Sequence, residues 1–434
     1  MKLSLRNVNK IHAADVELNG LTVIVGENDS GKSTIGRILF SVVKALTGTK
    51  ENDERKKHDR LMKYADALYK RLISVEPIFP IGNKANEGKT LFPRNAWEFV
   101  EQVKDVFDID SYIEMLSDSI DDMSATPKMK SLMKKDLIGI KQCLSYDLNR
   151  SASLNMEFQA VLESEFLNQM SQNNPENWSV MLFDDADNIM FQYDGAKENA
   201  KTDSINDEAL LDITYVESPL YMHLLEGLRF SQTYRELAYR RPSTRMMVPY
   251  HIKDFTDKIN SYRYRKVESK IDTKDIVGGE FEYDDRKKTV FFRKNGMELY
   301  PLNVASGIKI FGVLQMLLNS DYINAECPLV WDEPENHLHP QWQVEFAKIL
   351  VQLSKSGVPI LITTHSPYFL QAIRYFSALE KIEDYVNYYS AKPVDENRVD
   401  MVNVNKDLNS VFLSLATPLN RIMNVDAARQ GIEL

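Results

Sequence analysis

The loop GENDSGKS, Gly26–Ser33, constrains the fold of this 434-residue chain more than any other segment. It matches G-x-x-x-x-G-K-[ST], the pattern of a phosphate-binding loop. The preceding run LTVIV, Leu21–Val25, is apolar and β-branched, which is typical of a strand buried on both faces of a parallel sheet. Apolar residues follow the loop at helical spacing and predict a helix that ends near Gly48: Ile35, Ile38, Leu39, Val42, Val43 and Leu46.

A strand, a tight loop and a helix N-terminus direct several backbone N–H groups and the positive end of the helix dipole at one place, which suits a triphosphate. The alternative, a glycine turn before an ordinary helix, gives Lys32 and Ser33 no role. We therefore expect Lys32 to reach the β- and γ-phosphates of ATP and the Ser33 hydroxyl to bind Mg²⁺. The predicted nucleotide-binding residues here are Gly26, Glu27, Asn28, Asp29, Ser30, Gly31, Lys32, Ser33 and Thr34.

A second informative segment, CPLVWDEPENHLHPQW, begins at Cys327. Its apolar residues predict a short strand, and Asp332 at the end of that strand is placed to hold Mg²⁺ through water. Glu333 follows directly and is expected to act as the general base that deprotonates the attacking water. The alternative is that this acidic pair only caps the helix that Pro340 opens.

Two further segments add candidate residues. VPILITTHSPYFL, Val358–Leu370, predicts a strand with His365 at its carboxyl end, where parallel sheets bind their ligands. A lone histidine is usually structural, but next to the Asp332 strand we expect His365 to contact the γ-phosphate or the attacking water. In Pro301–Asp321, Ser306 is expected to cap an amphipathic helix.

Taken in order, these segments resemble the ATP-binding cassette (ABC) ATPases of the non-transporter branch, which includes the SMC proteins, RecF and the ATPase half of OLD-family nucleases. DEPENHLHP, Asp332–Pro340, looks like the D-E-P-E-x-x-L-H-P form of OLD-like and bacterial phage-defence ATPases. Transporter subunits instead favour a threonine after the first proline of this motif. ASGIK takes the place of the signature L-S-G-G-Q. It keeps Ser306 and Gly307, while Ile308 and Lys309 depart from the pattern.

The resemblance implies an α/β fold, a P-loop ATPase head with a mixed sheet flanked by helices, which forms a head-to-tail dimer or a higher homo-oligomer. Each ATP would lie between the phosphate loop of one subunit and the signature segment of the other, so Ser306 and Gly307 would bind the partner's nucleotide. Glu335–His339 takes the place of the D-loop and would lie at the same seam. Ile213–Leu220 stands near the place of the glutamine loop but contains no glutamine.

The chain is longer than a compact head requires. We assign residues 1–48 and 178–434 to the head, and 49–177 to a largely helical insertion that serves as a partner surface or as a structural lid. In the head, Trp178–Gly195 predicts a hairpin, and Gly278–Leu302 a hairpin or meander. Near the C-terminus we expect two edge strands and a closing helix: Tyr385–Ala391, Arg398–Val404 and Leu408–Met423.

The segment Arg229–Lys270 holds 11 Lys or Arg against 4 Asp or Glu, with aromatic residues interleaved. Such a mixture can grip a nucleic-acid backbone and stack bases, but a solvated face or a protein interface explains it equally well. The net charge of −10 argues against a protein that coats nucleic acid without specificity. Two isolated cysteines, no leader and no long apolar run indicate a cytoplasmic protein without membrane contact.

We therefore expect an enzyme that hydrolyses ATP with Mg²⁺ as a homodimer or higher oligomer. By resemblance, it senses a trigger and controls a separately encoded nuclease or toxin in defence against phages. The alternative is a DNA-binding ATPase of DNA repair resembling RecF or the SMC proteins. An OLD nuclease would need a Toprim domain after His365, and the 69 residues there lack its D-x-D pair.

Overall fold

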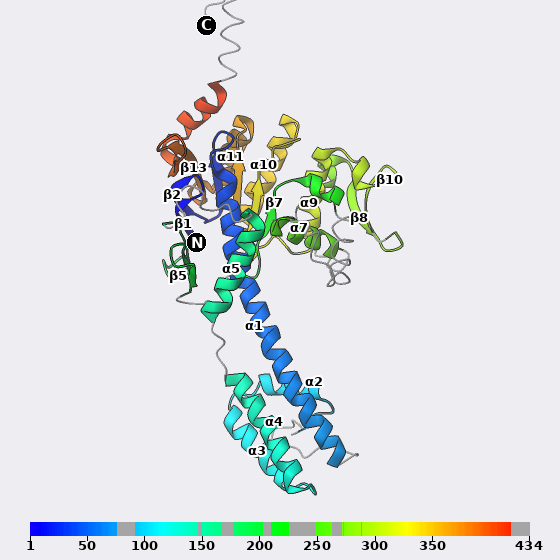
Figure 1. The fold of residues 1–434 in the computed structure, drawn as a ribbon. Helices are drawn as coiled ribbons and strands as arrows, with labels where there is room; N and C mark the ends of the chain where they lie inside the picture. The colour runs from blue at the N-terminus through cyan, green and yellow to red at the C-terminus, as the bar shows by residue number, and fades with distance from the viewer. Residues whose placement is uncertain are drawn as a thin grey trace, which may run out of the picture. The chain divides into compact units, whose positions relative to one another are not determined.

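The computed structural model describes residues 1–75, 92–145, 150–166, 177–202, 210–224, 248–262, 271, 273–287 and 289–417. The chain divides into two compact units, Met1–Thr47 with Leu154–Leu434, and Gly48–Ser153. We call the first the sheet unit and the second the helical unit (Figure 1).

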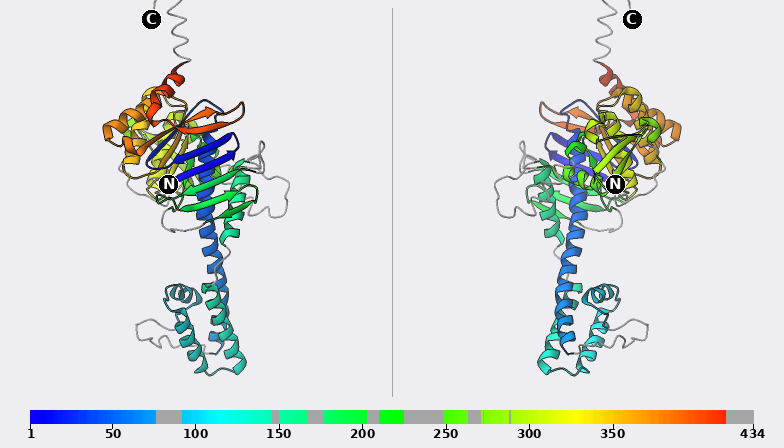
Figure 2. Two further views of the ribbon diagram at one scale, coloured as in Figure 1. Left: turned by 90° about the vertical axis from the view of Figure 1, so that its left-hand side faces the viewer. Right: turned by 90° about the vertical axis from the view of Figure 1, so that its right-hand side faces the viewer.

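The sheet unit is built on a mixed sheet with the strand order β6-β5-β4-β1-β2-β14-β13-β3-β12-β11-β7. Figure 2 shows strands from the start of the chain beside strands of the 180s and of the C-terminal part. The strands are β1 (Lys2–Val8), β2 (Ile11–Glu17), β3 (Leu21–Val25), β4 (Ser179–Phe183), β5 (Ile189–Asp194), β6 (Asn199–Lys201), β7 (Thr214–Val216), β11 (Leu329–Asp332), β12 (Ile360–Thr364), β13 (Val386–Pro393) and β14 (Val399–Asn403). The expected α/β fold with a mixed sheet is confirmed.

Five neighbouring strands, β13-β3-β12-β11-β7, run parallel. Every residue of β3, β7, β11 and β12 is buried, as expected of parallel strands covered on both faces. The prediction that the last two strands lie at an edge is wrong. β13 pairs with β3 and β14, and β14 pairs with β2, so both join the parallel half to the antiparallel half. Strand sequence does not reveal this, because pairing partners come from distant parts of the chain.

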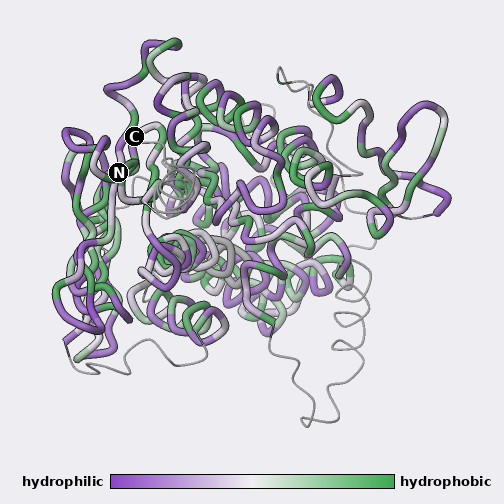
Figure 3. The backbone as a smooth tube through the Cα atoms, turned by 90° about the horizontal axis from the view of Figure 1, so that it is seen from above, coloured by the Kyte–Doolittle hydropathy of each residue, from purple (hydrophilic) through white to green (hydrophobic). Residues whose placement is uncertain are grey.

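Helices cover both faces of the sheet. Successive residues of β3 point to opposite faces, so Val23 and Val25 pack against one set of helices and Ile24 against another. Figure 3 shows hydrophobic and hydrophilic residues interspersed along the coiled parts of the chain, as expected of helices that each bury one face. The first set is α9 (Ser306–Asn319), α10 (Pro340–Lys355) and α11 (Pro367–Glu380), and the second is α1 (Lys32–Val75) and α5 (Arg150–Phe166).

Helix α1 does not end near Gly48, contrary to the prediction, but continues to Val75. A glycine inside a helix costs only about 1 kcal/mol relative to alanine. The residues after it are mostly strong helix formers, including Glu, Lys, Arg, Leu and Ala, and these outweigh that cost. The first part of α1 therefore belongs to the sheet unit and the remainder to the helical unit.

Both predicted hairpins are present. β4 and β5 pair antiparallel, and β4 joins the large sheet through β1. β8 (Glu280–Asp284), β9 (Thr289–Lys294) and β10 (Met297–Leu299) form a separate three-stranded meander. This meander packs on α9, where a Cβ on Gly312 would lie 2.2 Å from the ring of Phe281. Part of the predicted closing helix is helical, 408–417, and the remainder lies outside the described residues.

The helical unit combines the later part of α1 with α2 (Ala96–Lys104), α3 (Ile109–Asp121) and α4 (Pro127–Ser145) around a core of its own. An ion pair between Arg71 and Asp136 links α1 to α4. The unit ends at Ser153 and not at 177, where the sequence placed the boundary. Leu154, Phe158 and Leu162 of α5 are buried in the sheet unit, with Phe158 4.7 Å from Phe191 between ring centroids. No helix among the described residues is long and apolar enough to cross a membrane.

Candidate functional site

The loop of Gly26–Ser33 joins β3 to α1, as its sequence predicts. Gly31 has a φ of +80°, a backbone conformation that glycine adopts without strain. The Lys32 ammonium is buried and donates to the carbonyl oxygens of Gly26 at 2.9 Å and Glu27 at 2.7 Å. Lys10, in the turn after β1, forms an ion pair with Asp29 that tethers the loop to that turn.

A cavity of about 480 Å³ lies over this loop. It opens at the carboxyl ends of parallel strands, where β7, β11 and β12 stop beside β3. Ser30 Oγ is buried without a hydrogen-bond partner among the described residues, and such an atom at a cavity wall can bond to a ligand. The lining residues are Asn28, Asp29, Ser30, Gly31, Lys32, Ser33, Thr34, Glu217, Asp332, Glu333 and Asn336.

Asp332 ends β11 at the floor of this cavity and is almost fully buried. Its carboxylate accepts hydrogen bonds from the Thr363 hydroxyl and, at 3.4 Å, from the Tyr215 hydroxyl. Burial raises the pKa of the Asp332 carboxyl, hydrogen bonds from Thr363 and Ser33 oppose that change, and the nearby Glu217 and Glu333 carboxylates reinforce it. The structure thus brings the two predicted Mg²⁺ ligands, Ser33 and Asp332, together.

Glu333 follows Asp332 with a φ of +45°, and its N–H donates to the Thr363 hydroxyl at 3.0 Å. Its carboxylate lies 3.8 Å from the Lys32 ammonium and 3.2 Å from Nδ1 of His365. The Asn336 amide donates to the other carboxylate oxygen at 2.9 Å. Glu333 and His365, the predicted catalytic pair, are therefore neighbours, and Glu333 faces the cavity.

Glu335 begins the segment Glu335–His339 that is expected at a subunit seam, but its own side chain points into the fold. The side chain is buried, and its carboxylate accepts hydrogen bonds from the Thr364 hydroxyl at 2.5 Å and the His365 N–H at 2.9 Å. It therefore fixes the backbone that presents His365. His337 and His339, in the same segment, are exposed. From the sequence alone, a carboxylate three residues after Asp332 could be either exposed or buried, because the hydroxyl and N–H groups that bind it belong to Thr364 and His365, at the end of another strand.

These residues fit a magnesium ion. Mg²⁺ takes oxygen ligands and is commonly held by one or two carboxylates, a hydroxyl, phosphate oxygens and water. Asp332 and Ser33 offer such oxygens, and the buried Asp332 carboxylate has Glu217 and Glu333 nearby with no cation bonded to it among the described residues. No three His, Cys, Asp or Glu side chains of the described ranges form a metal cage, and this kind of site needs none.

The signature-like residues line a separate cavity of about 560 Å³, with no residue in common with the first. The expectation that Ser306 caps α9 is wrong, since Ser306 is the first helical residue and Ala305 holds the cap position without a side-chain bond. Ala305 thus offers no side-chain acceptor to the first N–H groups of α9 at this cavity. A Cβ on Gly307 would lie 2.9 Å from the Trp342 ring and 3.2 Å from the His337 carbonyl oxygen, so glycine alone fits without adjustment.

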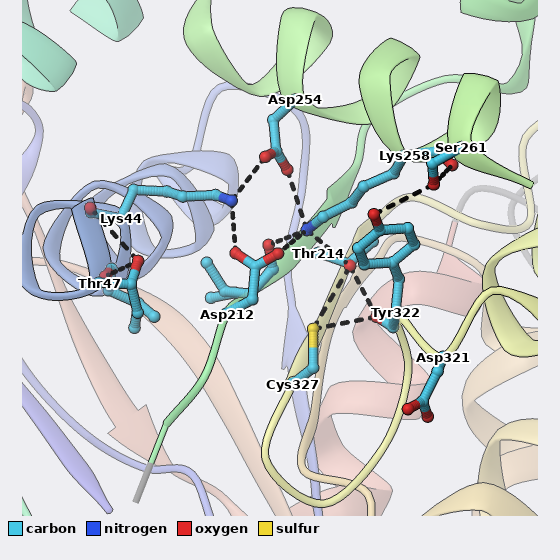
Figure 4. Close-up of polar contacts among 12 residues, drawn as sticks. Lys44, Thr47, Asp212, Thr214, Asp254, Lys258, Ser261, Asp321, Tyr322 and Cys327 are labelled. Atoms are coloured by element: carbon cyan, nitrogen blue, oxygen red, sulfur yellow. Dashed lines mark hydrogen bonds and ion pairs between the residues drawn. The ribbon is translucent and has the colours of Figure 1, made fainter. Parts of the chain in front are cut away.

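Most of the basic segment Arg229–Lys270 lies outside the described residues. The described part contains α7 (Tyr250–Ser261), in which Phe255 and Lys258 are buried. Figure 4 shows Lys258 and Lys44 each paired with both Asp212 and Asp254. These groups hold α7 against α1 and the start of β7, so Lys258 is not free to bind nucleic acid, whereas Lys253 of the same helix is exposed.

Sequence reasoning missed four residues that shape the first cavity: Tyr215, Glu217, Asn336 and Thr363. Glu217 directly follows β7, and its position after a buried strand was the available signal. Burial alone would raise the pKa of its carboxyl, but hydrogen bonds from His251 and Tyr221 and the charge of Arg37 lower the pKa to about 2.

Comparison with known proteins gives one family and a set of distant structures. Residues 1–370 match the model of the AAA ATPase domain. Among solved structures, the SMC head domain from Thermotoga maritima is 13% identical, covers 93% of this chain and 98% of its own, and has a TM-score of 0.36. An Smc head domain with a coiled coil and joint from Pyrococcus yayanosii is 10% identical. It covers 96% of this chain and 99% of its own, and has a TM-score of 0.36. No curated protein matches the chain.

Proposed function

The chain belongs to the family of AAA ATPase domains, and we propose that it hydrolyses ATP in the cavity over Gly26–Ser33. One observation carries the proposal. The loop and Lys32 lie in one cavity with Ser33, Asp332 and Glu333, which are the group types that phosphoryl transfer to water requires. Each comes from the end of a strand or the start of a helix, so the scaffold holds them rigidly.

Each residue has a distinct role in this proposal. The loop N–H groups and the Lys32 ammonium bind the phosphates, and the ammonium exchanges its bonds to Gly26 and Glu27 for phosphate oxygens. Ser33 and Asp332 would hold Mg²⁺, which neutralises phosphate charge when bound. Glu333 accepts a proton from water, and His365, whose Nδ1 lies 3.2 Å from the Glu333 carboxylate, contacts the γ-phosphate or the attacking water.

The proposed oligomer is a head-to-tail dimer or a larger assembly of such pairs. Its support is the second cavity, where Ser306, Gly307 and the uncapped start of α9 form a place for an anion in the same chain but away from Lys32. A nucleotide held by the loop of one subunit would contact this cavity of the other. Exposed His337 and His339 line the cavity and would also meet it.

The proposed output is control of a separately encoded effector, a nuclease or toxin, in defence against phages. The helical unit supports an interaction role because it exposes large apolar side chains, with Trp97 58% exposed and Phe107 fully exposed. The variant Trp97→Ser with Phe107→Ser should bind ATP normally and fail to co-purify with the product of the neighbouring gene. Tyr368→Ser, at an exposed residue of α11, is the control. If the unchanged protein, the double variant and Tyr368→Ser all captured the neighbouring gene's product equally, this surface would lose its support.

The alternative, a DNA-binding ATPase of repair, is supported by exposed Lys253 and by basic residues outside the described ranges, whereas Lys258 and Phe255 are buried. Steeply salt-dependent DNA binding by the purified chain would favour it. Weak binding with a shallow dependence on salt would favour the control of an effector.

The test of ATP hydrolysis uses Glu333→Gln, which retains size and removes the base. ATP turnover should fall by about 10²–10⁴-fold while ATP still binds. Glu345→Gln, which removes one carboxylate from α10, is the control and should turn over ATP normally. Normal turnover in Glu333→Gln would reject the assignment of the base.

A further inference from the structure

The Glu217 carboxylate forms part of the wall of the nucleotide cavity, where it poses an electrostatic problem. With a pKa lowered to about 2, it is ionised at neutral pH. An ionised carboxylate on the wall of a triphosphate site repels the ligand unless a cation compensates for it. Asp332 and Glu333 line the same cavity. Mg²⁺ would offset the charge of Asp332, but the Glu217 carboxylate requires a separate cation to compensate for it.

Two cationic groups meet Glu217 behind the cavity wall. Nη2 of Arg37, in the first turns of α1, donates to one carboxylate oxygen at 2.8 Å. Nε2 of His251 lies 2.9 Å from the other oxygen, which also accepts from the hydroxyl of Tyr221. Neither Arg37 nor His251 lines the cavity itself. Both therefore lie behind Glu217 and do not contact a nucleotide in the cavity.

The two partners of His251 favour its positively charged form. Its Nδ1 lies 2.7 Å from Glu165 of α5, and its Nε2 faces Glu217. A neutral imidazole has one N–H, so it would turn a nitrogen lone pair toward one of these two carboxylates. Protonation of both nitrogens gives each carboxylate a donor. Burial opposes the charge, but the hydrogen bonds to Glu165 and Glu217 prevail and raise the pKa of His251.

We propose that His251 is a positioning residue that, as a buried imidazolium between Glu165 and Glu217, compensates the Glu217 carboxylate and holds it against the wall of the nucleotide cavity. Arg37 and His251 together balance Glu165 and Glu217, so this four-residue cluster presents no net charge to a triphosphate. The proposal rests on ATP binding in this cavity and adds a residue that neither contacts the nucleotide nor belongs to the loop.

A variant at His251 is expected to fold because α7 has a second attachment. Asp254 and Lys258, one and two turns further along α7, are fixed by their ion pairs with Lys44 and Asp212 (Figure 4). The variant His251→Gln keeps a polar side chain of similar size and removes the charge. We expect ATP affinity about tenfold lower, since one uncompensated charge then faces the phosphates.

The decisive comparison is charge rescue, measured by calorimetry with ATP and Mg²⁺. Glu217→Gln should bind ATP a few-fold more tightly than the unchanged protein, and the double variant of His251→Gln with Glu217→Gln should recover the affinity lost in His251→Gln. Glu380→Gln, which removes one carboxylate from the surface pair with Lys355, is the matched control and should leave affinity unchanged. A role in packing alone predicts no rescue, because the second substitution restores no contact.

The outcomes separate the inference from the proposed function. Absence of ATP binding in the unchanged protein would reject the proposed function. Normal binding in the unchanged protein together with no rescue in the double variant would overturn the role of His251 alone. If His251→Gln does not fold, Glu217→Gln still decides: weaker ATP binding would show that Glu217 contacts the nucleotide or its metal directly and would overturn the inference.

Discussion

Lys32 is the residue on which nucleotide affinity depends most directly. Its ammonium is buried, and it is already directed at the loop that would hold the phosphates. Lys32→Ala removes charge-assisted hydrogen bonds worth about 1.5–3 kcal/mol each, so ATP affinity should fall about tenfold to a hundredfold or more. Lys348→Ala, on an exposed position of α10, is the control. Calorimetry showing equal affinity for both variants would reject the assignment of the phosphate loop.

Glu217 also predicts how stability depends on pH. Its carboxyl has a pKa of about 2 in the folded protein against 4.5 when unperturbed. A depressed folded pKa stabilises the protein above pH 4.5, and that contribution is lost as pH falls from 4.5 toward 2. The free energy of unfolding of Glu217→Gln should therefore fall less steeply across this range. Urea denaturation at a series of pH values measures it, and identical slopes would contradict the pairing with Arg37 and His251.

The role of a residue could be predicted from the sequence when its partners lie close to it along the chain. Lys32, Ser33 and Asp332 belong to short motifs that adjoin a strand, and the structure brings them to one cavity. Glu217 and Glu335 depend on His251 and Thr364, which lie on other elements of the fold. A sequence gives the distance between such residues along the chain but not in space. The orientation of the Glu217 and Glu335 side chains could therefore be learned only from the three-dimensional structure.

At the scale of elements, local pattern predicted where strands begin and end better than which strands pair. The apolar runs of β3, β11 and β12 were found from composition, because a strand buried on both faces contains few polar residues. The interior position of β13 and β14 was not found, since pairing register is set by the whole sheet. The continuation of α1 past Gly48 shows that one unfavourable residue does not end a helix with strong flanks.

The contact between α9 and the three-stranded meander gives a prediction about stability. A Cβ on Gly312 would lie 2.2 Å from the Phe281 ring, which is itself buried. Gly312→Ala should therefore destabilise the protein by about 1–3 kcal/mol through overpacking. Combining it with Phe281→Leu, which makes room, should restore part of the loss relative to Phe281→Leu alone. Thermal unfolding checks both, and an unchanged melting temperature in Gly312→Ala would contradict the close packing.

At the scale of the whole molecule, the two cavities of the sheet unit have complementary contents. One carries the phosphate loop with Asp332 and Glu333, and the other carries Ser306 and Gly307 at the start of α9. We propose that two chains complete each other's sites. Two variants that damage different cavities should then compensate for each other when mixed.

The most direct measurement of the central claim is ATP turnover by a mixture of Lys32→Ala and Ser306→Arg proteins. Each variant alone should be nearly inactive, because one lacks the binding lysine and the other fills the second cavity with a large side chain. A mixed dimer keeps one intact site, so an equal mixture should recover about a quarter of the activity of the unchanged protein if subunits exchange freely and sites act independently. No recovery, despite exchange shown with labelled subunits, would contradict a shared ATP site.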